Sequence, residues 1–278
     1  MFTKEDLIQD IIRMGVRETD TLFVHSSYKH AAGDIGIVGG ADTVVDAFIE
    51  YLAPKGLIVF PSMSWKLGYL VNDAGEYIPP WEGPKEGFHP YGNAFHVKTT
   101  PSDGLGIIPE VFRKRPGVIR SLSPTSSVCA MGADAAEFCA GHDQSPTPLN
   151  WDSPWGNLYR RGAKILFLGT TMACNTYMHA IEDYAALPGL LVPYEWQYTV
   201  EDYDGNVYPV HFKRHEPGHN HYYIKVQQEL IDQGIAKVVR FGAAECHLVD
   251  AVREADYMLA KLKKEPWLFT HEFNLQKE

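Results

Sequence analysis

The chain has few cysteines for its length, and none has a metal-binding or redox spacing. Its 278 residues contain four, Cys129, Cys139, Cys174 and Cys246, and no two form a CxxC pair. This scatter excludes a disulfide framework and a zinc ribbon. No apolar run approaches the roughly 20 residues of a membrane span, and acids stand where a signal peptide would be apolar. We therefore expect a cytoplasmic protein without a membrane anchor.

Basic residues are scarce relative to acidic ones. Lys and Arg number 25 against 35 Asp and Glu, for a net charge of −10 with neutral His. Nucleic-acid binders usually carry the opposite balance, so no nucleic-acid partner is expected. An acidic surface favours solubility, and carboxylates gathered in a cleft attract cations.

Several familiar catalytic motifs are also missing. The sequence contains no GxSxG nucleophile elbow, no P-loop and no GxGxxG turn. The missing elbow argues against the common serine hydrolases. A catalytic site must therefore be sought in less familiar combinations of residues.

The apolar pattern predicts alternating helices and strands around one sheet. A capped helix over 3–15 precedes an apolar strand at 21–25, and a helix over 44–52 precedes a strand at 57–60. This order predicts an α/β fold, a three-layer-like central sheet flanked by helices. Further helices are expected at 104–115, 133–140, from Ser153–Pro154 onward, 222–233 and 247–263, strands at 127–130 and 164–169, and a hairpin at 190–213 turning at Asp204-Gly205.

Residues 62–103 differ from the rest of the chain. They are rich in Trp, Tyr, Gly, Pro and His and show little periodicity. Abundant aromatic residues favour a small folded insertion over a disordered linker. We therefore expect a single domain over 1–278 with 62–103 as an inserted subdomain.

His179 is the first candidate for a catalytic base. It follows the buried strand that ends at Gly169, and α/β proteins place ligands beyond the carboxyl ends of their strands. On a helix, His179 and Glu182 would share a face, and the carboxylate would fix the imidazole tautomer and raise its basicity. A surface ion pair has the same spacing, so both interpretations stay open.

Other polar segments suit anion binding or nucleophilic chemistry. Val38-Gly39-Gly40 precedes a helix and could offer backbone N–H groups to a phosphate, or could simply turn the chain. Cys174 could be a thiolate activated by His179, or a packed, inert thiol. The set His215, His219 and His221 could bind a metal, but it lacks the helical spacing of a zinc-protease motif and equally fits a solvated loop.

A series of short motifs occurs in one order along nearly the whole chain. They are Val24-His25-Ser26-Ser27, Gly36-x-x-Gly39-Gly40-Ala41-x-Thr43, Phe60-Pro61-Ser62, Thr100-Pro101-Ser102, Gly106-x-x-Pro109-Glu110-x-Phe112-Arg113, Pro116-Gly117-Val118-x-Arg120-Ser121, Ser153-Pro154 and Asn175-Thr176-x-x-His179-x-x-Glu182. Together they resemble the aminoglycoside 3-N-acetyltransferases. The resemblance implies that family's own α/β fold, distinct from the GNAT fold. It also implies transfer of an acetyl group from acetyl-CoA to an amine, with no metal.

The resemblance also implies roles for particular residues. His179 would be the general base, Glu182 would orient it, and Thr176 or Ser26 could stabilise the developing oxyanion, leaving Cys174 without a required role. The implied coenzyme A contacts are His25, Ser26, Ser27, Val38, Gly39, Gly40, Arg120, Ser121 and Ser126. The carboxylates expected to bind a cationic acceptor are Asp152, Asp183 and Asp103.

The sequence departs from the family's pattern at two positions, of which the first bears on a coenzyme contact and the second on the acceptor. Ser123 precedes Pro124 where relatives commonly carry His, and His89 precedes Pro90 where relatives often carry an acid. The default acceptor is the 3-amino group of an aminoglycoside. The alternatives are another amine, such as an amino sugar or a biosynthetic intermediate, or a coenzyme A-binding protein without aminoglycoside turnover. A homodimer is also expected.

Overall fold

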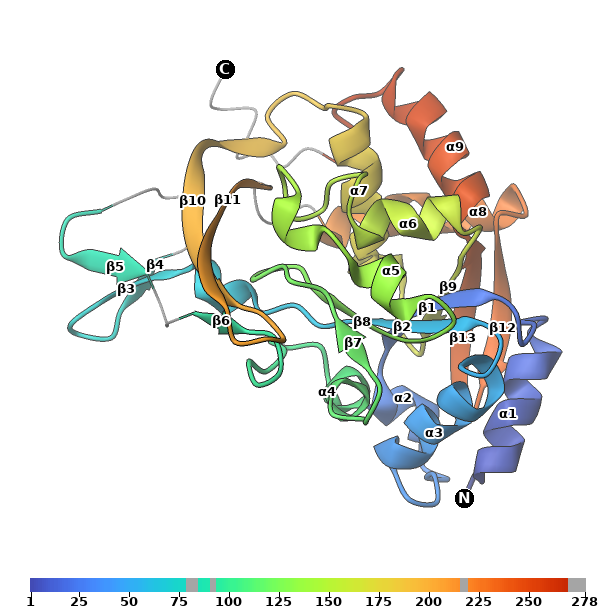
Figure 1. Ribbon diagram of the computed structural model, residues 1–278. Coiled ribbons are helices and arrows are strands. Elements are labelled where there is room, and N and C mark those ends of the chain that lie inside the picture. Colours follow the sequence, from blue (N-terminus) through green and yellow to red (C-terminus); the bar gives the residue numbers. More distant parts are fainter. Residues whose placement is uncertain (79–84, 91–93, 216–219, 270–278) are drawn as a thin grey trace.

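A seven-stranded mixed sheet forms the centre of the computed structural model, which describes residues 1–78, 85–90, 94–215 and 220–269 (Figure 1). Its strand order is β12-β13-β9-β1-β2-β8-β7. The strands are β1 (Thr21–Ser26), β2 (Leu57–Pro61), β7 (Ile119–Arg120), β8 (Val128–Gly132), β9 (Lys164–Leu168), β12 (Ala236–Phe241) and β13 (Ala244–Asp250). β1 runs parallel to β2 and β9, whereas β8 and β13 pair antiparallel on either side of these three.

Helices cover both faces of this sheet (Figure 1). On one face lie α1 (Lys4–Arg13), α2 (Tyr28–Ala32), α3 (Ala41–Leu52) and α4 (Ile107–Arg113); on the other lie α5 (Ala135–Cys139), α6 (Pro154–Arg160), α7 (Thr176–Tyr184), α8 (Gln227–Asp232) and α9 (Ala251–Leu262). Each face of the sheet packs against its own hydrophobic core, and side chains alternate between the two faces along β1. Leu22 and Val24 pack toward α1 and α3, whereas Phe23 packs toward α6 and α7. The expected three-layer α/β fold is therefore confirmed.

Two smaller sheets lie beside the central one, to the left in Figure 1. The first joins the hairpin of β10 (Leu191–Glu201) and β11 (Val207–His215) to β6 (Phe95–His96). The second has the order β4-β3-β5, from β3 (Leu70–Asn72), β4 (Tyr77–Ile78) and β5 (Phe88–Pro90). Because β6 pairs with β10, the 62–103 segment shares its apolar core with the hairpin, and its separateness as a subdomain stays a prediction.

The hairpin prediction is confirmed, but the C-terminal part of the chain differs from expectation. The segment 247–250 is the end of β13 rather than the start of a helix, because it pairs with both β9 and β12. The last helix begins at Ala251, where the Asp250 carboxylate accepts hydrogen bonds from the backbone N–H groups of Val252 and Arg253 at 3.1 and 3.0 Å. Residues 220–226 form a 3₁₀-helix (η5, Asn220–Val226) before α8, and β12 was not expected.

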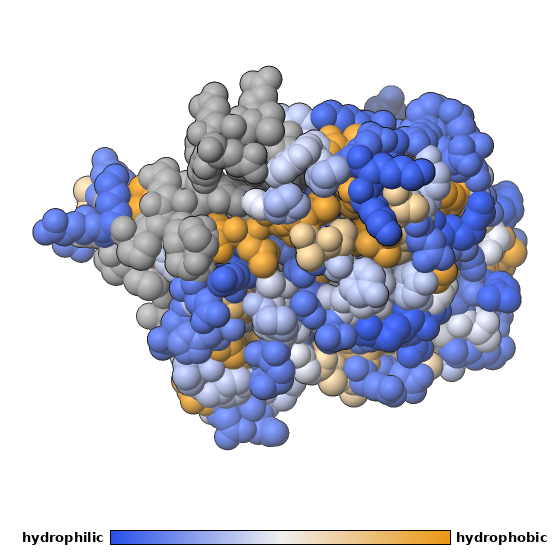
Figure 2. Space-filling view, turned by 90° about the horizontal axis from the view of Figure 1, so that it is seen from above, coloured by the Kyte–Doolittle hydropathy of each residue, from blue (hydrophilic) through white to orange (hydrophobic). Residues whose placement is uncertain are grey.

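The surface is mostly polar. Figure 2 shows hydrophilic side chains over much of one face, with hydrophobic ones gathered in a band beside the grey atoms. Within the described part of the chain, no helix is both long and apolar enough to cross a membrane.

Candidate active site

The loop between β9 and α7 brings the start of α7 to the same edge of the sheet as the end of β1. It leaves β9 through Gly169, whose φ is +61° and whose absent Cβ would lie 2.6 Å from the Cβ of His30 in α2. Only glycine fits this close approach and left-handed backbone. The His30 Nδ1–H also donates to the Gly169 carbonyl at 2.6 Å. α2 and the approach to α7 are thereby held together beyond the carboxyl ends of two neighbouring parallel strands.

His179 lies on α7 in a hydrogen-bonded group with two other side chains. Its Nδ1 is 2.6 Å from the Tyr223 hydroxyl and 3.3 Å from Glu182 Oε2, and Tyr223 also donates to Glu182. A tyrosine hydroxyl has one proton. Since Tyr223 gives that proton to Glu182, its oxygen accepts the Nδ1–H of His179. This arrangement assigns the neutral tautomer in which Nε2 carries the free lone pair.

Burial determines the protonation states in this group. The His179 side chain is 15% exposed and that of Glu182 only 1%. Burial lowers the pKa of His179, and the hydrogen bond and charge of Glu182 oppose that shift. Burial also raises the pKa of Tyr223 well above its ordinary value, with the Glu182 charge acting in the same direction. A neutral imidazole beside a neutral phenol and a buried carboxylate has the composition of a general base with a partner for the imidazolium that forms.

The role of Tyr223 was not anticipated from the sequence. It lies in η5, 44 residues from His179, and no local motif marks it. Its fully buried ring meets the His179 ring edge-on, with 5.1 Å between centroids. Only the packing of η5 against α7 reveals the contact.

A second histidine–carboxylate pair adjoins the first. His215, the last residue of β11, has its Nε2 2.9 Å from Asp183 Oδ2, and its ring centroid is 5.5 Å from that of His179. Thr147 donates to the same Asp183 oxygen. Burial acts to raise the pKa of Asp183, but hydrogen bonding and charge from His215 outweigh it and lower that pKa. Asp183, predicted to bind the acceptor, thus lies near His179, with one oxygen already hydrogen-bonded.

The histidine set considered for metal binding divides between described and undescribed residues. His215 pairs with Asp183, whereas His219 and the side chain of His221 lie outside the described residues. No three His, Cys, Asp or Glu residues of the described chain are grouped as metal ligands.

Three helix N-termini meet around the end of β1. Ser27 precedes α2, Gly40 precedes α3 and Gly106 precedes α4. A Cβ on Gly40 would lie 3.6 Å from the Tyr28 hydroxyl, and one on Gly106 would lie 3.9 Å from the Ser26 carbonyl. The first N–H groups of a helix have no partner within it and attract anions. The predicted Ser26-Ser27 and Val38–Gly40 segments therefore lie together in a setting suited to phosphate.

Two details of this region bear on ligand binding. The Ser26 hydroxyl is buried and has no hydrogen-bond partner among the described residues, while Val38 is 50% exposed. Gly39 has a φ of +75°, and a Cβ there would lie 2.4 Å from the Thr43 hydroxyl. Glycine at position 39 is thus required by backbone conformation as well as by the available space.

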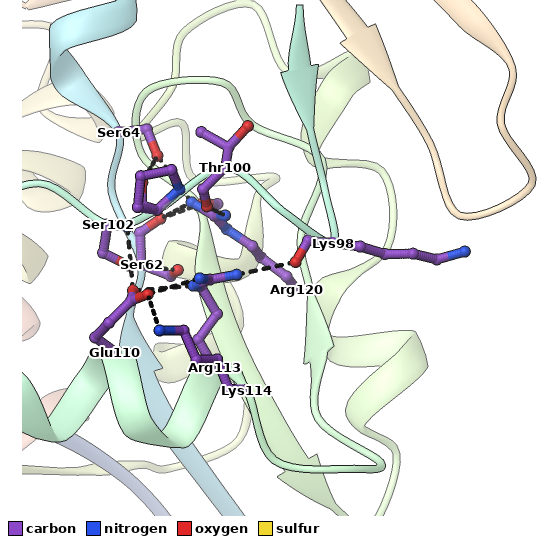
Figure 3. Close-up of polar contacts among 11 residues, drawn as sticks. Ser62, Ser64, Lys98, Thr100, Ser102, Glu110, Arg113, Lys114 and Arg120 are labelled. Carbon is purple, nitrogen blue, oxygen red and sulfur yellow. Dashed lines mark hydrogen bonds and ion pairs between the residues drawn. The ribbon is translucent and has the colours of Figure 1, made fainter.

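Arg120 binds the protein chain itself. Its guanidinium donates to Ser127 and Ser64 at 2.9 Å and to the carbonyls of Ser62 and Thr100, so it joins β7 and β8 to the start and end of the 62–103 segment (Figure 3). Burial lowers its pKa to about 10, which leaves it cationic at neutral pH. As a coenzyme A contact Arg120 stays a prediction, since four of its hydrogen bonds are internal.

An ion-pair cluster at α4 lies next to Arg120 (Figure 3). Glu110 pairs with Arg113 at 2.6 Å and with Lys114 at 3.1 Å, and it accepts a hydrogen bond from the Ser102 backbone. Burial acts to raise the pKa of Glu110, but these hydrogen bonds lower it to about 2. The Glu110 and Arg113 of the family-like motif therefore fix α4 to the end of the 62–103 segment.

The remaining predicted coenzyme contacts are mostly buried. His25 stacks on Phe167 with 5.2 Å between ring centroids, and burial lowers its pKa to about 3. The Ser121 hydroxyl is 2.8 Å from His142 Nδ1. The Ser126 carbonyl accepts from the indole of Trp155 at 3.0 Å. These residues stay predictions as ligand contacts, and their described contacts are with other parts of the protein.

The other predicted acceptor and catalytic residues are spread over separate segments. Asp152 is exposed in the turn before α6, and Asp103 accepts from the Lys66 backbone N–H at 3.0 Å. Thr176 is the first residue of α7, where helical N–H groups lack intrahelical partners. Cys174 is exposed, so the expectation that it is packed was wrong; its Sγ lies 3.2 Å from the Thr170 hydroxyl.

Comparisons with known proteins identify the family of the chain. The sequence model of the family described as aminoglycoside 3-N-acetyltransferase matches residues 23–263. The aminoglycoside N(3)-acetyltransferase VIII of Streptomyces fradiae is 30% identical over 260 residues, covering 90% of this chain and 87% of that protein.

Solved structures with related names share the fold. AAC-IIIb in a binary complex with CoASH superposes with a TM-score of 0.78 at 24% identity, covering 95% of this chain and 97% of the other. AAC-VIa bound to sisomicin superposes with a TM-score of 0.77 at 24% identity, covering 95% and 98%. Because the family match spans most of the sequence, the chain belongs to the aminoglycoside 3-N-acetyltransferase family, whose members are acyltransferase enzymes with acetyl-CoA as co-substrate.

Proposed function

We propose that the protein transfers an acetyl group from acetyl-CoA to the 3-amino group of an aminoglycoside, with His179 as the general base. The observation that carries the proposal is the group of His179, Tyr223 and Glu182. It leaves Nε2 of a partly exposed imidazole with a free lone pair, beyond the end of a parallel strand. The family's acceptors are amines, which suits a base at this position.

The chemistry of the base follows from its hydrogen bonds. An ammonium group is not a nucleophile until a proton leaves, and His179 Nε2 takes that proton so that the amine can attack the thioester carbonyl. The C–S bond then breaks, and coenzyme A leaves as a thiolate that takes a second proton from the attacking nitrogen. The imidazolium then donates from Nδ1–H to the Tyr223 hydroxyl, and that hydroxyl donates to the Glu182 carboxylate, whose negative charge stabilises the imidazolium. General-base catalysis of this kind contributes about 10²- to 10⁴-fold in rate. Direct attack needs no protein nucleophile, so Cys174 has no covalent role.

Coenzyme A would bind where the three helix N-termini meet. The Ser26 hydroxyl, which has no hydrogen-bond partner among the described residues, and the backbone N–H groups around Gly39 and Gly40 are the groups best placed to donate hydrogen bonds to phosphate or pantetheine oxygens. No Cβ stands in the way at either glycine. Thr176, the first residue of α7, supplies a hydroxyl at a helix N-terminus for the charge that develops on the thioester oxygen.

An aminoglycoside is the first candidate acceptor because of the family and the excess of acidic residues. Asp183 lies beside His179, and Asp152 and Asp103 are further carboxylates proposed to pair with acceptor ammonium groups. One observation favours a second candidate, a less cationic amine: one Asp183 oxygen is already occupied by His215 and Thr147.

A thiol-release assay with acetyl-CoA tests the acceptor. We expect free thiol to appear with members of a panel of 2-deoxystreptamine aminoglycosides. The product's 3-amino position, located by NMR, should carry the acetyl group. If only simpler amines are acetylated, the protein is still an acetyltransferase, but its acceptor is the less cationic amine and not an aminoglycoside. No turnover of any amine, with coenzyme A still bound, would contradict the proposed reaction.

Location and assembly complete the proposal. All four cysteines are free thiols and one of them is exposed, which suits the reducing cytoplasm. A homodimer is proposed from the family resemblance, and light scattering on the pure protein tests it.

A further inference from the structure

A buried polar pair joins the start of α7 to α9, outside the group that holds His179. Asn175 directly precedes α7, Glu254 lies in the first turn of α9, and both residues are 0% exposed. The Asn175 side-chain amide donates from Nδ2 to Glu254 Oε1 at 2.7 Å. No step of the proposed reaction uses either side chain.

Each group has a second oxygen without a partner. Asn175 Oδ1 and Glu254 Oε2 are both buried, and neither has a hydrogen bond to any residue that the structure describes. Leaving buried acceptors unpaired is costly. An ionised carboxylate offers no proton to the amide oxygen. A protonated carboxyl does, because its O–H can donate to Asn175 Oδ1 while its other oxygen keeps the existing bond.

We propose that Glu254 is held as a neutral carboxylic acid whose two parallel hydrogen bonds with Asn175 position the start of α7, and with it His179, against α9. Glu254 would then be a positioning residue that acts on the reaction only through the helix. The functional part of this inference rests on the proposed role of His179, whereas the protonation of Glu254 does not.

Among the described residues, no positively charged group compensates a charge on Glu254. The elements packed against α9 include α6, α7 and β13. The titratable groups that interact electrostatically with Glu254 are Tyr177 on α7 and Asp250 at the end of β13. Arg253, next to Glu254 in sequence, donates instead to the carbonyls of residues 233 and 234. A charge on Glu254 would therefore be buried without an opposite charge.

The titration expected for such a group agrees with the hydrogen bonds. Burial raises the pKa of Glu254 to about 8, Asp250 acts in the same direction and the Asn175 hydrogen bond opposes it. A carboxyl whose pKa is higher in the folded than in the unfolded protein keeps its proton on folding. The stability it contributes is complete below the unfolded pKa and is lost as pH rises toward about 8.

The variant Glu254→Gln tests the role of the titrating proton, because it keeps the hydrogen bonds of the pair and removes the titration. Glutamine can donate to Asn175 Oδ1 and accept from Nδ2, so it makes both hydrogen bonds without titrating. We expect wild type and Glu254→Gln to have similar Tm values near pH 5. The wild-type Tm should then fall below that of the variant by about 5 °C or more by pH 8, with the difference levelling off above that pH. The exposed Glu245→Gln is the matched control and should follow wild type throughout.

Parallel Tm curves for wild type and Glu254→Gln from pH 5 to 9 would overturn the neutral-acid assignment. The positioning role is tested by kcat for acetyl transfer over the same range. Wild-type kcat should decline as pH passes about 8, Glu254→Gln should show no such decline, and Glu254→Ala should be slower at every pH. Identical alkaline profiles for wild type and Glu254→Gln would overturn the positioning role, even if Glu254→Ala does not fold. Absence of turnover in every protein would count against the proposed function alone, because the melting curves need no activity.

Discussion

Replacing Tyr223 with Phe removes the group that connects His179 to Glu182. The hydroxyl that accepts from His179 Nδ1 at 2.6 Å and donates to Glu182 disappears, while the ring that packs against α7 remains. The imidazole then loses the acceptor that fixes its tautomer. Among the described residues, the carboxylate contact that remains to it is Glu182 Oε2 at 3.3 Å.

The size of the effect follows from the kind of hydrogen bond that is lost. Hydrogen bonds to charged groups contribute about 1.5–3 kcal/mol, and 1.36 kcal/mol corresponds to about tenfold in rate. If this interaction is made fully in the transition state, when the imidazolium forms, kcat should fall by about 10- to 150-fold. KM for both substrates should change little, because Tyr223 is proposed to contact neither of them.

The assay is steady-state thiol release at saturating acetyl-CoA, with Tyr51→Phe as the matched control. Tyr51 also donates one hydrogen bond, to the Val16 carbonyl at 2.8 Å, and it packs on the opposite face of the sheet. Its loss should affect stability and leave kcat unchanged. A Tyr223→Phe enzyme within twofold of wild-type kcat would refute the reasoning that Tyr223 fixes the base.

Three further predictions address the ligands and the thiol. Gly39→Val should reduce the rise in Tm that coenzyme A produces in wild type, because the left-handed backbone and the nearby Thr43 hydroxyl exclude a branched side chain. An equal rise in Tm in both proteins would show that the phosphate does not bind at Gly39. Cys174→Ser should keep wild-type kcat, and an inactive variant together with a trapped acetyl-enzyme would require a covalent mechanism. kcat/KM for an aminoglycoside should fall more steeply with ionic strength than that for a monoamine, since more charges are attracted by the acidic surface; equal slopes would contradict electrostatic capture.

Local patterns were sufficient for most of the fold. The parallel strands β1, β2 and β9 are continuous apolar runs buried on both faces, and such runs are recognisable without tertiary information. β12 was missed because most of its residues are exposed or half-buried, so it contains no continuous buried run. β13 is buried from Cys246 to Val249, but this short run leads directly into α9. The residues of β13 that precede α9 then read as part of the helix. Pairing with β9, which no local pattern reports, makes them a strand.

The candidate site was predictable only where its residues are close in sequence. The spacing of His179 and Glu182 indicated their contact, since residues three apart share a helix face. Tyr223 reaches them across 44 residues, and His215 reaches Asp183 across 32, so neither contact leaves a local signal. The sequence also could not show whether a basic side chain faces a ligand or is buried in the protein. Arg120 is 2% exposed, and it donates hydrogen bonds to backbone carbonyls of the protein itself.

The direct test of the central claim is acetyl transfer by His179→Ala, measured together with its affinity for coenzyme A. His179 is the only residue proposed to take the proton from the acceptor. We therefore expect thiol release to fall by about 10²-fold or more, while calorimetry shows coenzyme A binding as in wild type. A variant that keeps wild-type turnover would contradict the assignment of His179 as the general base.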